Sequence, residues 1–193
     1  MMRSAEVKRK TEETEIAISL NLDGGAVKVD TGIGFFDHML TAFGVHGGFG
    51  LTVQVSGDLH VDGHHTVEDT GIVLGKAFHQ ALSDKGGIAR FGSFYVPMDE
   101  ALAFAAVDIS GRPYLVFDAE FREGRIGAFD TGLCEEFFRA FAFNSGMTLH
   151  LRTLSGKNAH HKIEALFKAA AHALGDAVKP KGSGALSTKG AID

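Results

Sequence analysis

Two copies of a His-His-x-x-Glu motif are the residues of this sequence best suited to chemistry. The copies are His64, His65 and Glu68, and His160, His161 and Glu164. In a helix, residues three or four positions apart share a face, so each Glu can join a histidine of its own motif. Adjacent helical residues diverge by about 100°, so one His-His pair can serve two different metal ions. Imidazole nitrogen with carboxylate oxygen suits divalent Mn, Fe, Co, Ni or Zn.

The two motifs lie in register with a repeat of the surrounding sequence. A shift of 96 residues places His64 on His160 and Gly50 on Gly146, and it places the alternating segment 51–55 on 147–151. A single His-His pair at a helix start is usually a cap or a surface feature. Packing, however, gives no reason for His, His and Glu to recur together. We therefore interpret the motifs as metal ligands in an internally duplicated chain.

Two further candidate ligands lie on the helices expected before each motif. His38 comes 26 residues before His64, and Glu136 comes 24 residues before His160. Each has a plain alternative interpretation. His38 would then be a polar residue on a helix face, and Glu136 a solvated carboxylate.

A third group of residues could bind an anion, although each alone is more often an exposed charge. Arg pairs with phosphate bidentately, whereas Lys acts as a point charge. Arg90 and Arg112 sit among turn residues, and Lys168 follows Glu164 by four positions on the same helix face. The other candidates, in the Gly- and Lys-rich tail, are Ser187, Thr188 and Lys189.

The spacing of apolar residues predicts the elements that position these groups. Strands are expected over 6–22, 26–30, 51–55, 94–97, 101–109, 114–121 and 147–151. Helices are expected over 35–43, 65–83, 135–143 and 161–178. The turn signal Asp23-Gly24-Gly25 makes 26–30 the expected hairpin partner of the first strand.

These elements predict an α+β protein, a two-layer α/β sandwich made by internal duplication of a β-β-α-β-α unit. The sheets would lie on one side and the helices on the other. No low-complexity linker separates the halves, so residues 1–193 are expected to form a single structural unit. Residues 1–92 would be the first half, and residues 93–193 the second half with an irregular C-terminal tail.

The bulk composition limits the classes of function. The net charge of −5 with neutral His argues against a large nucleic-acid footprint, but it allows a small basic pocket for one phosphate. The single cysteine, Cys134, excludes an intrachain disulfide and a Cys-rich zinc site. The polar N-terminus does not resemble a secretory signal, and no apolar run approaches the roughly 20 residues of a membrane span. We therefore expect a cytoplasmic protein with no membrane partner.

Motifs along nearly the whole chain, from residue 9 to residue 190, match one known family in order. They are Arg9-Lys-Thr-Glu-Glu-Thr14, Leu22-Asp-Gly24, Phe36-Asp-His-Met-Leu40, Gly57-Asp-Leu-His-Val-Asp62, His64-His-Thr-Val-Glu-Asp69, Arg90-Phe-Gly92, Asp99-Glu-Ala-Leu102, Ser110-Gly-Arg-Pro-Tyr114, Glu135-Glu-Phe-Phe138, Gly146-Met-Thr-Leu-His150, His160-His-Lys-Ile-Glu-Ala165 and Ser187-Thr-Lys-Gly190. With these motifs, the chain resembles the imidazoleglycerol-phosphate dehydratase family of histidine biosynthesis.

The resemblance implies an enzyme that converts imidazole glycerol phosphate to imidazole acetol phosphate and water, with two Mn ions per active site. It implies a fold of the ribosomal protein S5 domain 2-like type and a homo-oligomer, a 24-mer with active sites between subunits. Some family members have His at the position of Glu136. The implied metal ligands are His38, His64, His65, Glu68, Glu136, His160, His161 and Glu164.

The resemblance also implies substrate-binding and catalytic residues. The phosphate would be held by Arg90, Arg112, Lys168, Ser187 and Lys189. Other substrate contacts would come from Glu13, His38, His46, His64, Glu68, His160 and Thr188. The catalytic residues would be Glu13, His38, Glu68 and Glu164, with Glu13 as the proton carrier. Without the family, Glu13 would be interpreted as an exposed charge on a strand.

Two other functions remain open on the residues alone. A dinuclear metal hydrolase acting on a phosphate ester would use the same His and carboxylate ligands and would release inorganic phosphate. A non-enzymatic metal-binding scaffold would bind metal and assemble without turnover. Neither alternative explains the motifs outside the candidate metal ligands.

Overall fold

The structure is a computed structural model that describes residues 3–182, 184–188, 190 and 192. The first half of the chain contains β1 (Ser4–Lys10), β2 (Thr14–Asn21), β3 (Val27–Asp30), α1 (Gly34–Gly47), β4 (Gly50–Gly57) and α2 (His64–Leu82). The second half contains β5 (Phe91–Met98), β6 (Ala101–Asp108), β7 (Tyr114–Asp118), β8 (Arg125–Ile126), β9 (Phe129–Asp130), α3 (Leu133–Ser145), β10 (Thr148–Ser155) and α4 (Ala159–Ala177). No helix of the described part is long and apolar enough to cross a membrane.

Two four-stranded sheets share one topology, which confirms the duplication. The first has the order β1-β2-β4-β3, and the second has the order β5-β6-β10-β7. In each sheet the last strand of the order pairs in parallel and the other pairings are antiparallel. Leu51 and Val53 of β4 are buried, as are the residues 96 positions later, Met147 and Leu149. The predicted α+β class is therefore confirmed.

The predicted strand over 6–22 is wrong, because the chain turns back within it. The hydroxyl of Thr11 accepts hydrogen bonds from the backbone N–H groups of Glu13 and Thr14, 3.2 and 3.1 Å away. This turn separates β1 from β2, which pair as an antiparallel hairpin. The first half therefore has three strands before its first helix, which correspond to β5, β6 and β7 of the second half, where the two-residue strands β8 and β9 follow. The buried residue of β1, Val7, lies at an odd position, whereas the buried residues of β2 lie at even positions. The residues between Val7 and Ile16 are polar or small, so alternation of large apolar residues does not reveal this change or the turn.

The segment 26–30 is not the hairpin partner of the first strand, which is a second error of the sequence-based prediction. β2 pairs with β1 on one edge and with β4 on the other, so both of its edges are occupied. β3 therefore pairs in parallel with β4. Gly25, at a φ of +146°, lets the chain pass close to Gly50, where a Cβ atom would lie 3.2 Å from the Gly50 Cα.

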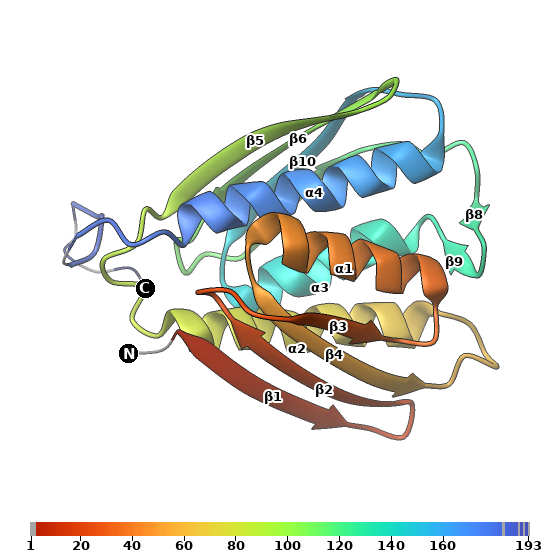
Figure 1. Cartoon of the computed structure of the whole chain (residues 1–193), viewed down its shortest axis with the longest axis horizontal. Coiled ribbons are helices and arrows are strands. Elements are labelled where there is room, and N and C mark those ends of the chain that lie inside the picture. The colour runs from red at the N-terminus through yellow and green to blue at the C-terminus, as the bar shows by residue number, and fades with distance from the viewer. Residues whose placement is uncertain (1–2, 183, 189, 191, 193) are drawn as a thin grey trace.

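The helices of the two halves pack against each other and the sheets lie outside them (Figure 1). Each half has its sheet on one side and its helices on the other, as predicted, but the halves meet through their helices instead of side by side. Glycines permit the close approach. A Cβ atom on Gly71 of α2 would lie 2.6 Å from the carbonyl oxygen of Phe137 in α3, and one on Gly175 of α4 would lie 2.8 Å from that of Gly47 in α1.

Phenylalanine rings fill the core between the helices. Phe36 of α1 and Phe137 of α3 meet edge to face with ring centroids 5.4 Å apart, and Phe78 of α2 meets Phe141 in the same way at 5.3 Å. Phe167 of α4 stacks on Phe137 at 5.2 Å. Edge-to-face and offset contacts at these distances are the favoured arrangements of aromatic rings. One shared aromatic core therefore fixes the positions of all four helices.

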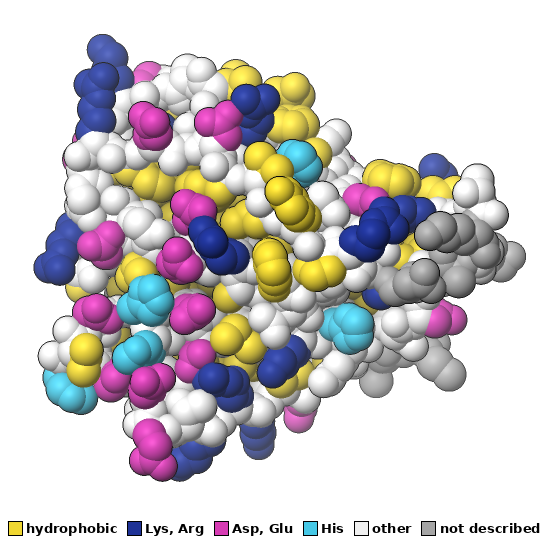
Figure 2. All heavy atoms as spheres, turned by 180° about the vertical axis from the view of Figure 1, so that it is seen from behind, with side chains coloured by type: hydrophobic (Ala, Val, Ile, Leu, Met, Phe, Trp, Pro, Cys, Tyr) yellow, Lys and Arg dark blue, Asp and Glu magenta, His cyan; other side chains and the backbone are white. Residues whose placement is uncertain are grey.

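All four helices begin at the same end of the molecule, on the right in Figure 1. Both His-His pairs lie in the first turn of a helix, at the start of α2 and α4. His38 and Glu136 also lie near the starts of α1 and α3. The fold therefore gathers the candidate ligands at one end, where Figure 2 shows histidine and acidic side chains intermixed, on the left in that view.

Candidate metal centre

The closest group of candidate ligands joins α1 to α4. His38 Nε2 and His160 Nε2 lie 3.2 and 3.1 Å from the same carboxylate oxygen, Oε2 of Glu164. Among the described residues, this is the one group whose His and carboxylate ligand atoms all lie within 4.8 Å of one another. Two imidazoles and one carboxylate at this spacing fit a divalent mid-row ion after small side-chain rotations. We call this group the α1–α4 cluster.

The carboxylate of the α1–α4 cluster is buried and ionised. Glu164 is 6% exposed, and its other oxygen, Oε1, lies 2.7 Å from the ammonium of Lys168. Burial works to raise the pKa of Glu164, but hydrogen bonds from Lys168 and His38 outweigh burial and hold the pKa below its usual range. Lys168, expected to bind phosphate, therefore contacts a candidate metal ligand in this structure.

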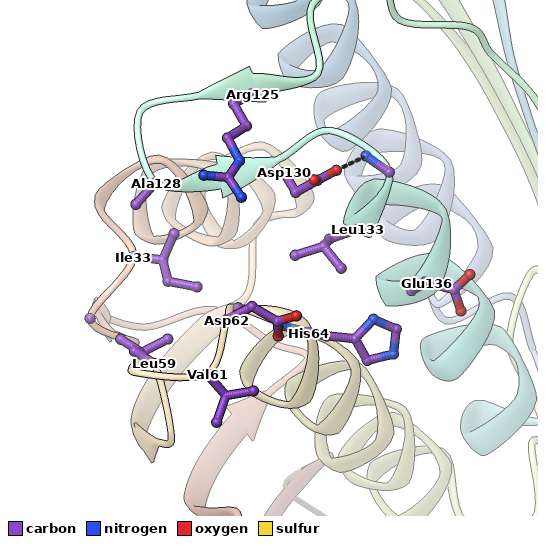
Figure 3. Close-up of a pocket in the computed structure, with 13 residues that line it drawn as sticks. Ile33, Leu59, Val61, Asp62, His64, Arg125, Ala128, Asp130, Leu133 and Glu136 are labelled. Atoms are coloured by element: carbon purple, nitrogen blue, oxygen red, sulfur yellow. Dashed lines mark hydrogen bonds between the residues drawn. The ribbon is translucent and has the colours of Figure 1, made fainter.

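A second group lies at the interface of α2 and α3. His64 Nε2 is 3.5 Å from Glu68 Oε2, one helical turn along α2. His64 also lines a pocket of about 640 Å³ together with Glu136 of α3. Figure 3 shows both side chains at the same end of this pocket, with Arg125 on its opposite wall. We call His64, Glu68 and Glu136 the α2–α3 group. It is the repeat counterpart of the α1–α4 cluster in a more open arrangement.

The remaining histidine of each pair points away from its neighbour. The rings of His64 and His65 are inclined at 87°, and those of His160 and His161 at 78°. His65 Nδ1 lies 3.0 and 3.2 Å from the two carboxylate oxygens of Asp58, and its Nε2 lies 3.6 Å from Glu13 Oε1. His64 and His65 therefore contact different carboxylates.

His161 has matching surroundings in the second half. Its Nδ1 lies 2.7 Å from Glu100 Oε2, and its Nε2 lies 3.6 Å from Asp99 Oδ2. Hydrogen bonds that the rings donate to carboxylates raise the pKa of both outward histidines, to Asp58 for His65 and to Glu100 for His161. Neither histidine belongs to a group of three close ligands within the described chain.

The two arginines expected to bind phosphate converge on Asp108. Arg90 contacts both carboxylate oxygens of Asp108, with Nε at 2.7 Å and Nη2 at 3.2 Å, and its Nη1 donates to the backbone carbonyl of Leu186 at 2.6 Å. Arg112 Nη2 lies 3.7 Å from Asp108. Because Leu186 precedes Ser187 and Thr188, the described tail lies beside the arginines. Lys189 lies outside the described residues.

His46 lies apart from the arginines and forms a pair with His172. His46 Nδ1 is 3.2 Å from His172 Nε2, and the ring of His172 stacks on Phe94 with centroids 4.3 Å apart. Burial lowers the pKa of both histidines, and the positive charge of Lys168 lowers the pKa of His46 further. His46 is thus held near Lys168 and the α1–α4 cluster. The described residues expected to hold the phosphate therefore lie in two places within one chain, with Arg90 and Arg112 at Asp108 and Lys168 at Glu164.

The sequence-based reasoning missed the carboxylates around these groups. Asp58 and Asp99 stand within the family-like motifs but were given no role. Glu100 and Asp108 contact residues that are distant in sequence, at His161 and Arg90. No spacing rule connects such pairs, because only the fold brings them together. His172 could have been noticed, since it follows Lys168 by four positions on one helix face.

Comparisons with known proteins identify the family of the chain. The family model described as imidazoleglycerol-phosphate dehydratase matches residues 31–174. Proteins with that name from Lacticaseibacillus casei and Acetivibrio thermocellus are 60% and 56% identical to the chain, over 99% and 100% of it and 100% of their own lengths.

Solved structures show the same fold. The imidazoleglycerol-phosphate dehydratase from Staphylococcus aureus has a TM-score of 0.85 at 43% identity, covering 92% of this chain and 99% of its own. The enzyme from Pyrococcus furiosus, solved in complex with (S)-C348, has a TM-score of 0.85 at 38% identity, covering 96% of this chain and 100% of its own. The chain therefore belongs to the imidazoleglycerol-phosphate dehydratase family of hydro-lyases.

Proposed function

We propose that this protein removes water from imidazole glycerol phosphate to give imidazole acetol phosphate, as a cytoplasmic step of histidine biosynthesis. The observation that carries the proposal is the α1–α4 cluster, in which two imidazoles converge on one carboxylate oxygen at 3.1–3.2 Å. Family membership supports the choice of reaction, and this geometry supports the proposal that a metal ion would bind there.

Two Mn ions per active site fit the donor sets. The α1–α4 cluster and the α2–α3 group each offer three nitrogen or oxygen ligands from one chain. The outward histidines, His65 and His161, would each complete a set that begins on another subunit. Because both point away from the groups of their own chain, we assign the active site to a boundary between subunits of a homo-oligomer, a 24-mer like that implied by the family. The substrate is the only other partner we assign.

Bound metal would supply Lewis acidity toward the imidazole ring and the diol of the substrate and would hold them in one orientation. Hydroxide leaves the carbon next to the ring, and the neighbouring carbon loses its proton, so that an enol forms and then becomes the ketone. Glu13 is our candidate to take the proton from carbon and return it. It lies at the tip of the β1–β2 hairpin, 3.6 Å from His65 Nε2, and is half exposed.

The phosphate would be held at a distance from the reacting carbons. Arg90 and Arg112 already converge on a carboxylate, and a phosphate can accept the same bidentate hydrogen bonds. Ser187, Thr188 and Lys189 would add contacts from the tail. Lys168 and His46 belong to the separate group near Glu164, so a neighbouring subunit would be needed to unite the two. Remote binding of this kind holds the diol in register.

Chelator-treated protein, assayed with and without added Mn²⁺, tests the proposal. We expect the ketone phosphate to form only with Mn²⁺, as measured by mass spectrometry, and we expect Glu164→Gln to lose both tight metal binding and turnover. The matched control is Glu15→Gln, which removes an exposed carboxylate that pairs with Lys10. Release of inorganic phosphate would select the hydrolase. Full metal content and assembly without turnover would select the scaffold.

A further inference from the structure

Each outward histidine has its Nδ1 atom against a carboxylate. For His161 the acceptor is Glu100 at 2.7 Å, and for His65 it is Asp58 at 3.0 and 3.2 Å. A carboxylate can only accept a hydrogen bond, so in the neutral imidazole the proton must sit on Nδ1. The lone pair then remains on Nε2, the atom available to a ligand.

The two carboxylates are not copies of each other. Asp58 follows directly after β4, whereas Glu100 lies in the turn between β5 and β6. The residue 96 positions after Asp58 is Leu154, and the residue 96 positions before Glu100 is Ser4. Duplication of the chain would copy positions, so it does not account for this contact. In the two halves, the carboxylate that contacts Nδ1 therefore comes from different parts of the fold.

Glu100 is itself held rigidly. Its Oε1 accepts hydrogen bonds from the backbone N–H groups of Lys157 and Asn158, 2.9 and 2.8 Å away. Asn158 in turn caps α4 by accepting from the backbone N–H of His161. These bonds, first the one from Asn158, lower the pKa of Glu100 to about 2, so it stays ionised. One carboxylate thereby ties the β5–β6 turn to the start of α4 and orients the ring of His161.

The carboxylates raise the pKa of both histidines, so they also favour the protonated ring when no metal is bound. A metal ion binds only a ring nitrogen that carries no proton, and the proton that remains then sits on Nδ1, against the carboxylate. Histidines that bind metals are commonly oriented in this way, by a carboxylate on the ring nitrogen that does not bind the metal.

We propose that Glu100 and Asp58 are positioning residues that fix His161 and His65 as Nδ1–H tautomers with Nε2 free to bind a divalent metal ion. This inference rests on the proposed metal-dependent function. It adds two residues to the metal-binding machinery, neither of which would touch the metal or the substrate.

Glu100→Gln is the decisive variant. Its amide oxygen can still accept from the backbone of 157–158, while its NH₂ group would face His161 Nδ1 and donate to it. Nδ1 would then become the acceptor, and the proton would move to Nε2. Both oxygens of Asp58 face His65 Nδ1, so the variant for that histidine is Asp58→Ala, which removes the acceptor. We expect Mn²⁺ affinity, measured by calorimetry on the chelator-treated protein, to fall by about 10- to 100-fold in each variant, while the melting temperature of the metal-free protein changes little.

Asp118→Asn is the matched control, since Asp118 pairs with Arg152 on the exposed side of the second sheet and contacts no histidine. Glu100→Ala should also weaken Mn²⁺ binding, but with a loss of stability at the start of α4. Unchanged Mn²⁺ affinity in Glu100→Gln and Asp58→Ala would overturn the inference and leave the proposed function intact.

Nitrogen-15 spectra of metal-free protein labelled at histidine give a readout that does not depend on metal. At a pH high enough for the ring to be neutral, the signal of His161, assigned by its loss in His161→Gln, should show the proton on Nδ1. A proton on Nε2 in the wild-type protein would overturn the inference directly. Wild-type protein that has the Nδ1–H tautomer but binds no Mn²⁺ would instead contradict the proposed function, and the metal-positioning role with it.

Discussion

Glu13 is the residue whose assigned role depends most on family resemblance, because its surroundings in one chain are open. Its carboxylate is half exposed and reaches only His65, at 3.6 Å. Glu13→Gln keeps the size and removes the base, so we expect turnover to fall by about 10²- to 10⁴-fold. The Mn²⁺ content, measured by elemental analysis, should stay at the wild-type level.

Glu12→Gln is the control for this variant, since Glu12 is an exposed acid in the same turn. Wild-type turnover in Glu13→Gln would remove Glu13 from the mechanism. Loss of metal together with turnover would instead place Glu13 among the ligands.

The His46–His172 pair makes a prediction about pH. Burial, first of all, lowers the pKa of both histidines in the folded protein, where His46 also faces Lys168 and Glu164, and His172 faces Asp176. As the pH falls below about 6.5, the unfolded chain takes up protons at these histidines before the folded protein does. The pair therefore makes the folded state less stable in mild acid and has no such effect above that pH.

His172→Gln should flatten this dependence. We expect the free energy of unfolding of metal-free protein to decline less between pH 7 and pH 5 in the variant than in the wild type, as measured by urea titration. His150→Gln, which replaces an exposed histidine, should behave like the wild type. Identical pH dependence of the free energy of unfolding in His172→Gln and the wild type would contradict the prediction. It would show that the pair takes up protons equally in the folded and unfolded states.

At the scale of residues, the sequence predicted which residues are candidate ligands but not which of them lie in contact across the fold. Spacing within one helix correctly placed Glu164 beside His160 and Lys168, because helical geometry is local. His38 joins the same cluster because α1 packs on α4, and the spacing of residues in the sequence does not predict this packing. The acceptors Asp58 and Glu100 lie in turns, where their side chains obey no period.

At the scale of elements, close helix packing depends on glycine. A Cβ atom on Gly75 of α2 would lie 2.6 Å from the carbonyl oxygen of Phe141 and 2.8 Å from the Cβ of Asn144, both in α3. We expect Gly75→Ala to destabilise the protein by about 1–3 kcal/mol, the usual cost of overpacking. The measurement is the urea midpoint, with an unchanged slope indicating an unchanged unfolded state.

Gly34→Ala is the matched control, because Gly34 opens α1 and nothing lies within 4 Å of an added Cβ atom. This substitution should be neutral or stabilising, since alanine favours the helix. Equal effects of the two substitutions would show that helix propensity, and not the contact between α2 and α3, controls the outcome.

The elements with a clear period were predicted, and those without one were missed. All four helices occur where apolar spacing placed them, with ends that differ by a few residues. β8 and β9 have two residues each and are too short to show alternation. The strand order was not predictable from the turn at 23–25, because the placement of β3 depends on β4, which comes later in the chain and occupies the free edge of β2.

At the scale of the whole molecule, the duplication was visible in the sequence but the packing of its halves was not. The 96-residue register implies two similar units and gives no contact between them. That contact is made by small residues on α2 and α4 and by aromatic residues on α3, which read as ordinary core positions. Its consequence is functional, because it brings His38 of one half beside His160 of the other.

Among the residues that the structure describes, neither outward histidine belongs to a group of three close ligands. If His65 completes the α1–α4 cluster of a neighbour, an intact centre needs His38 from one subunit and His65 from another. His38→Ala and His65→Ala should each be inactive as pure proteins. When the two variants are co-expressed, activity should return. At some boundaries the His65→Ala subunit contributes its α1–α4 cluster with His38, and the His38→Ala subunit contributes His65, so both histidines are present.

Random assortment of equal amounts would make about a quarter of such boundaries intact, and turnover and Mn²⁺ content should recover to that share. The control is co-expression of His38→Ala with Glu164→Gln, two changes in the same cluster. Every boundary then lacks one ligand, so no recovery is expected. Recovery in the first mixture and none in the second would locate the centre between subunits. Failure of both, with assembly intact, would mean that His65 does not complete the α1–α4 cluster of a neighbour.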